Sequence, residues 1–182
     1  KVEAELLSAK ADLLENEHQQ LAAALDLRLR AIALDEHADA LHTAALALAV
    51  KNDDLPRYLD LLSKLAEEAQ RTRTPGGTRS HARHLLRLGA VVEHQLKDFE
   101  RAAGLYAKVE ALGECTTEAW FSLARVAGAR GDHAEQRRVL TRIAELDDTR
   151  AGKDEKNGAR FLLAELELQE PEWRAQGIET LK

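Results

Sequence analysis

Apolar side chains recur three and four positions apart along most of the chain, in segments separated by short polar turns. This spacing is the period of an amphipathic α-helix and differs from the strict alternation of a β-strand. Asp54, Asp98 and Asp132 stand at N-cap positions, where a short carboxylate accepts hydrogen bonds from the first turn. The pattern predicts an all-α chain with helices over residues 2–16, 19–34, 38–51, 54–72, 80–95, 98–113, 117–130, 133–147, 157–169 and 172–182.

The helical pattern also repeats along the chain. Residues 98–112 (DFERAAGLYAKVEAL) match residues 132–146 (DHAEQRRVLTRIAEL) at an offset of 34 residues, and a second offset of 78 residues relates more distant segments. Such repetition is typical of stacked helical hairpins, because each hairpin buries its apolar face only against a neighbour. Loops predicted at 70–79 and 149–156 exceed the usual connection, so we expect long units to alternate with short ones.

The repeats resemble the tetratricopeptide repeat family, whose units are helix–turn–helix hairpins, and residues 82–150 carry the resemblance most specifically. One unit shows it through Trp120, Leu123 and Ala124 in the first helix, Gly131 and Asp132 in the turn, and Leu140 and Ile143 in the second helix. The resemblance implies a right-handed α-solenoid of about five tandem antiparallel helical hairpins. It would form one repeat domain over 1–182, with approximate units 1–38, 39–79, 80–116, 117–150 and 151–182.

The chain departs from the family pattern in several places. Tyr58 and Gln136 occupy positions where the family has a small alanine, which predicts looser or shifted helix packing. The unit 80–116 has one extra residue in its inner turn. Family members that clamp the carboxylate of a chaperone peptide use Lys and Asn in their first helices. That mode is not supported, because the matching positions hold Thr43 and Ala47, Leu86 and Ala90, and Phe121 and Arg125.

Charge and cysteine usage narrow the class of partner. The net charge of −6 argues against whole-surface binding to nucleic acid or to an anionic membrane, and no apolar run approaches the length of a membrane span. Cys115 is the single cysteine, so it cannot form an internal disulfide, and we expect a cytoplasmic protein in which it is a bystander thiol. Because the sequence starts at Lys1 and stops inside a helical pattern, we expect a piece of a longer chain.

Candidate binding residues follow from the resemblance. Trp120 and Trp173 match core positions of their hairpins, whereas Phe121 and Phe161 lie one position further, which faces the concave groove in the family. The alternative for both phenylalanines is packing between repeats. The candidate groove residues are Lys51, Arg83, Leu86, Glu93, Phe121, Arg125, Phe161 and Glu165.

A basic segment lies near the middle of the chain. Residues 69–92 contain no Asp or Glu but carry His81, His84 and the arginines Arg71, Arg73, Arg79, Arg83 and Arg87. Guanidinium groups bind carboxylate and phosphate through two hydrogen bonds, so the segment is a candidate contact for an acidic peptide, a phosphate or a nucleic-acid backbone. The alternative is a solvated loop followed by a polar helix face. Pro75, Gly76 and Gly77 predict that loop, ahead of a helix that starts near Ser80.

The motifs of common catalytic and metal sites are missing. The sequence has no cysteine pair, no HExxH spacing, no phosphate-binding loop and no carboxylates that stand out as an acid and base. We therefore predict no catalytic residues, metal or cofactor, and a scaffold that binds a peptide or protein in the groove of a helical repeat array. Two alternatives are a regulatory or substrate-recruiting segment of a larger enzyme and a structural spacer without a ligand. Oligomerisation stays open.

Overall fold

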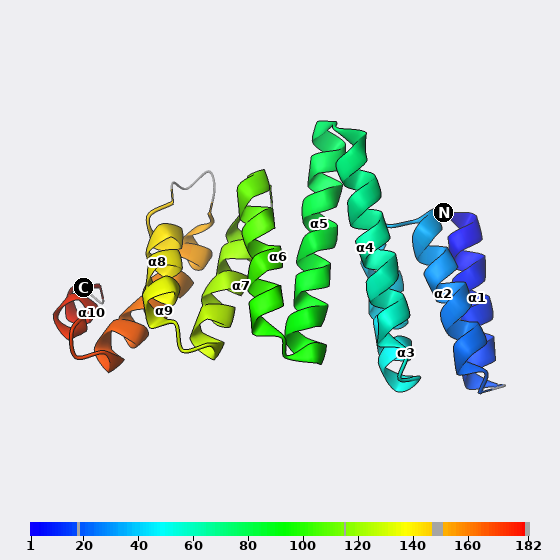
Figure 1. The fold of residues 1–182 in the computed structure, drawn as a ribbon, viewed down its shortest axis with the longest axis horizontal. Coiled ribbons are helices and arrows are strands. Elements are labelled where there is room, and N and C mark those ends of the chain that lie inside the picture. The colour runs from blue at the N-terminus through cyan, green and yellow to red at the C-terminus, as the bar shows by residue number, and fades with distance from the viewer. Residues whose placement is uncertain (18, 115, 147–150, 181–182) are drawn as a thin grey trace. The chain divides into compact units, whose positions relative to one another are not determined.

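The structure is a computed structural model and describes residues 1–17, 19–114, 116–146 and 151–180. Over these residues all regular secondary structure is helical, which confirms the all-α prediction (Figure 1). Ten α-helices and one π-helical turn are found in the described part, close to the predicted positions. Cys115 and residues 147–150 lie outside the described residues.

The chain divides into two compact units, residues 1–71 and residues 72–182. The first unit is built from α1 (Val2–Asn16), α2 (Leu21–Leu34), α3 (Asp39–Lys51) and α4 (Leu55–Thr72). The second contains α5 (Pro75–Val91), the π-helical turn Val92–Leu96, α6 (Phe99–Leu112), α7 (Thr116–Ala129), α8 (His133–Ala144), α9 (Lys153–Gln169) and α10 (Arg174–Thr180). A single repeat domain over both units stays a prediction.

The core of the first unit combines small and large side chains. Ala4 and Ala11 of α1 are buried, as is Ala24 of α2, so the backbones of these two helices pack closely. Tyr58 is buried at its unusual position in α4, and its hydroxyl lies 2.9 Å from Nδ1 of His42 in α3. The tyrosine is therefore held in this core by a polar contact as well as by apolar packing.

In the second unit each helix packs against the next along the chain, from α5 to α10. Figure 1 shows α5 to α9 side by side in this order. The predicted N-caps Asp98 and Asp132 are confirmed, because their carboxylates accept hydrogen bonds of 3.0 Å from the N–H groups of Arg101 and Glu135. The two caps are separated by the repeat offset, so α6 and α8 begin in the same way.

The long loop predicted at 70–79 is wrong. Helix α4 ends at Thr72 and α5 begins at Pro75. The hydroxyl of Thr74 caps α5 by accepting a 3.0 Å hydrogen bond from the N–H of Gly77. Pro and Gly normally interrupt a helix, but the first turn tolerates proline because its N–H would have no intrahelical partner. The Pro–Gly–Gly sequence therefore starts a helix. The long loop that was expected to make this unit longer than its neighbours is absent.

The helix predicted to begin at residue 157 begins earlier, at Lys153. Its start is stabilised by a 2.8 Å hydrogen bond from the N–H of Gly152 to the Glu155 carboxylate. Part of the predicted 149–156 loop lies outside the described residues. The described part is mostly helical, because the polar residues 153–156 form the first turn of α9.

The extra residue in the inner turn of 80–116 coincides with the π-helical turn Val92–Leu96. A π-helical turn takes up an additional residue without ending the helix. The turn then stops at Lys97, whose left-handed φ of 55° reverses the chain toward α6. Glu93 lies within this turn and is buried, although a carboxylate is normally found in water.

Candidate functional site

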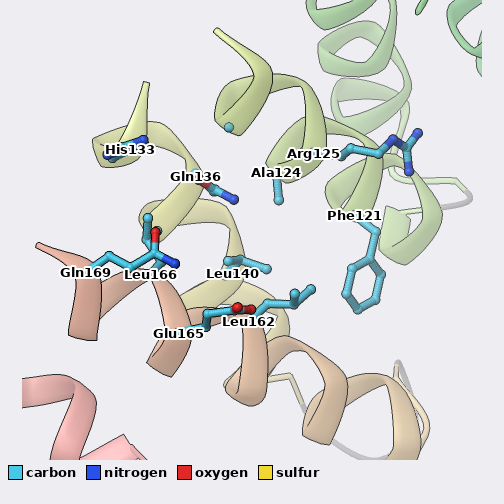
Figure 2. A pocket seen from close by; sticks show the side chains of 11 residues that line it. Phe121, Ala124, Arg125, His133, Gln136, Leu140, Leu162, Glu165, Leu166 and Gln169 are labelled. Carbon is cyan, nitrogen blue, oxygen red and sulfur yellow. The ribbon is translucent and has the colours of Figure 1, made fainter. Parts of the chain in front are cut away.

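A cavity of about 620 Å³ opens between α7, α8 and α9 in the second unit. Its volume lies in the range of roughly 300–1,000 Å³ that is usual for ligand pockets. Figure 2 shows the lining side chains, with Leu162 and Glu165 of α9 facing Leu140 of α8. The lining residues are Phe121, Ala124, Arg125, Gly128, His133, Gln136, Leu140, Leu162, Glu165, Leu166 and Gln169.

Helical spacing places these side chains on common faces. In α7 the buried side chains of Trp120 and Leu123 hold one face against the core, which confirms the core position predicted for Trp120. Phe121 and Arg125, one turn apart, lie on the part of α7 that lines the cavity. The same spacing on α9 brings Leu162 and Glu165 to the opposite wall. The cavity thus lies between faces of α7 and α9, and α8 contributes His133, Gln136 and Leu140 to its lining.

The back of the cavity depends on a glycine. A Cβ atom added to Gly128 would lie only 2.9 Å from Nε2 of Gln136. The large side chain of Gln136, at a position where the repeat pattern has alanine, therefore fits against α7 because residue 128 has no side chain. No hydrogen bond is found for the side-chain amide of Gln136 among the described residues, so its polar atoms are available at the cavity wall.

An ion pair between the half-exposed Arg125 and the buried Glu93 supports the α7 side. The guanidinium of Arg125 donates from Nε and Nη2 to the two carboxylate oxygens of Glu93, at 2.5 and 2.8 Å. The hydroxyl of Tyr106 donates to Glu93 at 2.7 Å. Burial alone would raise the pKa of the Glu93 carboxyl, but the hydrogen bonds from Arg125 and Tyr106 outweigh it, so the pKa lies below its ordinary value. Glu93 is therefore a charged group that positions Arg125.

Tyr106 keeps its proton within this network. Burial, followed by the hydrogen bond and the charge of Glu93, raises the pKa of the Tyr106 hydroxyl. The hydrogen bond to Glu93 likewise raises the pKa of Arg125, so both donors stay protonated around neutral pH. Tyr106 is almost fully buried, which confirms its predicted core position.

The two remaining ionisable groups of the cavity lining differ in whether they have a partner. His133 at the rim lies 2.5 Å from the carboxylate of Glu170. Glu165, in contrast, has no hydrogen bond or ion pair for its carboxylate within the described part of the chain. Each cationic or potentially cationic group of the lining thus already faces an acidic partner, and one carboxylate of the lining does not.

The structure brings together some of the predicted groove residues. Phe121, Arg125 and Glu165 line the cavity, and Glu93 holds Arg125 from behind. Phe161 is 63% exposed on α9, one turn before Glu165, but does not line the cavity. The remaining candidates are an exposed Arg83, a buried Leu86 and, in the first unit, Lys51, which pairs with Glu15 at 3.1 Å.

The basic segment is divided between the two units. Arg71 belongs to the first unit and pairs with Glu67 at 3.3 Å. The other four arginines belong to the second unit, where Arg79 pairs with Glu114 at 3.3 Å. The cavity does not include any of these arginines. The segment is therefore a separate feature from the cavity, and a contact to an anionic partner there stays a prediction.

Several lining residues were not among the predicted groove residues. Leu162 and Leu166 lie on the same helix as the predicted Glu165, and their i, i+4 spacing was a signal that could have added them. For Gln136 the sequence indicates only a departure from the repeat pattern. The missing signal was its partner Gly128, because a large residue that replaces alanine needs space on the facing helix.

A second buried carboxylate lies nearer the carboxyl end. Glu167 of α9 accepts hydrogen bonds from Nε of Arg137 at 2.9 Å and from the hydroxyl of Thr180 at 3.0 Å. The Arg137 guanidinium also lies 5.2 Å from the ring centre of Trp173. Trp173, predicted at a core position, is only half-buried, so that prediction is wrong; it immediately precedes α10. This cluster joins α8, α9 and the segment of α10 through the contacts of Glu167 and Arg137.

Comparison of the chain with protein-family models, curated proteins and solved structures found no match in any of the three. Within the described ranges, no helix is both long enough and apolar enough to cross a membrane. Function is therefore inferred from the geometry of the second unit.

Proposed function

We propose that this chain is a tetratricopeptide-like helical repeat protein whose second unit binds a peptide or protein partner in the cavity between α7, α8 and α9. The cavity is the observation that supports this proposal. Its apolar lining residues Ala124, Leu140 and Leu166 are accompanied by polar and charged side chains. Pockets that bind ligands combine these two features, because apolar burial supplies affinity and a few polar groups supply orientation.

The fold supports the same proposal. Consecutive helices pack against one another through the second unit, and the equivalent caps Asp98 and Asp132 recur at the repeat offset. A right-handed solenoid of five hairpins would place the cavity on its groove face. Because the cavity is already formed, binding would cost little ordering of the receptor.

Exposed apolar side chains next to the cavity favour a macromolecular partner. Leu162 is 43% exposed at the cavity wall, and its chain neighbour Phe161 is more exposed still. Contiguous apolar surface is typical of interaction sites, and an apolar partner group at the cavity would extend the surface that Leu162 offers. In a structural spacer, by contrast, these side chains would have no binding role.

The test is selection of short random peptides displayed on phage against the immobilised chain, followed by affinity measurements on the recovered peptides. Leu162→Gln removes an apolar contact of the cavity wall and should weaken binding by about 1 kcal/mol. Leu96→Gln is the matched control, because Leu96 is 44% exposed in the same unit but does not line the cavity. Binding to the control variant should equal binding to the unchanged chain.

The spacer alternative makes the opposite prediction. If no peptide is recovered, or if Leu162→Gln and Leu96→Gln affect every recovered peptide equally, the cavity is not the binding site. Thermal unfolding of both variants establishes that each substitution leaves the fold intact.

A further inference from the structure

We propose that the partner of the cavity is a basic segment, from which one Lys or Arg side chain enters the cavity and pairs with Glu165. This inference deepens the proposed function and rests on it. It names the chemical class of the partner through the balance of charges inside the cavity.

The cationic and potentially cationic groups of the lining already face carboxylates. Arg125 makes a two-point ion pair with Glu93, and His133 faces Glu170 at 2.5 Å. Figure 2 shows the guanidinium of Arg125 directed away from Gln136 and Leu140. An acidic ligand would therefore have to compete with a carboxylate that is already in place, at a cost in desolvation and lost pairing.

Glu165 is the complementary feature. Its carboxylate is the one acidic group of the lining, and within the described residues it has neither an ion pair nor a hydrogen bond. Covering it with an apolar ligand would remove water from a charge without replacing the lost hydrogen bonds. A guanidinium or ammonium group supplies these bonds and the opposite charge.

The shape of the cavity fits the rest of such a side chain. Lys and Arg combine a long apolar stem with a charged end, and they commonly bury the stem along apolar surface. Leu162 and Leu166 lie within one turn of Glu165 on α9 and offer that surface. The side-chain amide of Gln136 has no hydrogen bond among the described residues, so it can pair with the backbone of the entering segment. The net charge of −6 also favours the approach of a basic partner.

The experiment uses a positional-scanning library of acetylated and amidated peptides, bound to the full chain at low salt. We expect enrichment of Lys or Arg at one position of the bound peptides. Glu165→Gln should weaken the enriched peptides about tenfold or more, and Glu165→Lys should abolish the preference for a basic residue. Because Glu165 is exposed, neither substitution should shift the unfolding midpoint appreciably.

The matched control is Glu118→Gln, which removes the same charge from an exposed position of α7 that does not line the cavity. It should leave the affinity of the enriched peptides unchanged. Affinity should also fall as salt rises in the unchanged chain, with a smaller salt dependence in Glu165→Gln.

Two results would overturn the inference in different ways. Peptides that are sensitive to Leu162→Gln but carry no Lys or Arg preference, or that bind Glu165→Gln equally well, would leave the proposed function intact and remove the basic partner. Recovery of no peptide sensitive to Leu162→Gln would remove both. The two failures are thus distinguished by the Leu162 variant.

Discussion

Glu93 and Arg125 form an ion pair whose two sides differ sharply in exposure. The Glu93 side chain is 4% exposed at the π-helical turn, whereas the Arg125 side chain is 49% exposed on α7. The carboxylate depends on its partners for stabilisation, while the guanidinium keeps access to water. Removing one partner should therefore have a different effect from removing the other.

Replacing Arg125 should destabilise the second unit more than replacing Glu93. Arg125→Leu leaves a buried carboxylate without its cation, a change that typically costs about 3–5 kcal/mol. Glu93→Gln keeps an acceptor for Tyr106 and leaves a half-exposed guanidinium that water can solvate, so the loss should be nearer about 1.5–3 kcal/mol. Urea unfolding at neutral pH measures both values. Equal losses of unfolding free energy in the two variants would show that the difference in exposure does not decide the cost of losing a partner.

The same pair should contribute to the pH dependence of stability. The folded-state pKa of Glu93 is lowered. Its contribution is therefore present above the unfolded pKa, about 4.3, and is lost as pH falls through the folded value. In Arg125→Leu, burial without the cation should raise the pKa of Glu93 above its unfolded value. Glu93 should then favour the folded state at low pH, and this effect should be lost as pH rises. The difference in unfolding free energy between the two proteins should shrink from pH 7 to pH 4. A constant difference would contradict this assignment.

The helices were predictable because their signals are local. Apolar spacing located all ten helices that the described residues contain, and the N-cap positions of Asp98 and Asp132 followed from residue type. The start of α5 was not predicted, because Pro75 and its glycines carry a linker signal when read alone. The outcome depended on Thr74, whose capping hydrogen bond makes the Pro–Gly–Gly sequence a first turn.

The cavity was predictable only in part, for a different reason. The resemblance to a repeat family placed Phe121, Arg125 and Glu165 among the groove candidates, and all three line the cavity, although their binding role stays a prediction. Pairing between helices was not visible in the sequence. The contact of Glu93 with Arg125 joins positions 32 residues apart and depends on a π-helical turn that no local pattern announced.

Thr74→Ala should reveal the cap that the sequence concealed. The substitution removes the hydrogen bond to the Gly77 N–H and should cost about 0.5–2 kcal/mol. Thr78→Ala is the control, because its hydroxyl only bonds back to the Thr74 carbonyl and alanine favours a helix. Urea unfolding should show a loss for Thr74→Ala alone, and hydrogen exchange of the Gly77 amide should become faster. An unchanged exchange rate would mean that the cap does not hold this turn.

Two helical glycines should respond in opposite ways to alanine. A Cβ atom at Gly89 would lie 2.6 Å from the ring of Tyr106, whereas a Cβ at Gly104 would meet no atom within 4 Å. Gly89→Ala should therefore destabilise the chain by about 1–3 kcal/mol through overpacking. Gly104→Ala should stabilise it by about 0.5–1 kcal/mol, because alanine favours the helix. Thermal or urea unfolding decides between the two signs, and a gain for both variants would show that α5 and α6 approach less closely.

Gly128 and Gln136 should be energetically coupled. A Cβ at residue 128 would come within 2.9 Å of the Gln136 side-chain amide, which must then move. Gly128→Ala should consequently gain little or no stability in the presence of Gln136. In the Gln136→Ala background the contact is absent, and the same substitution should gain about 0.5–1 kcal/mol. A double-mutant cycle by urea unfolding measures this coupling. If Gly128→Ala has the same effect in both backgrounds, Gly128 does not make room for Gln136, and this account of the cavity wall fails.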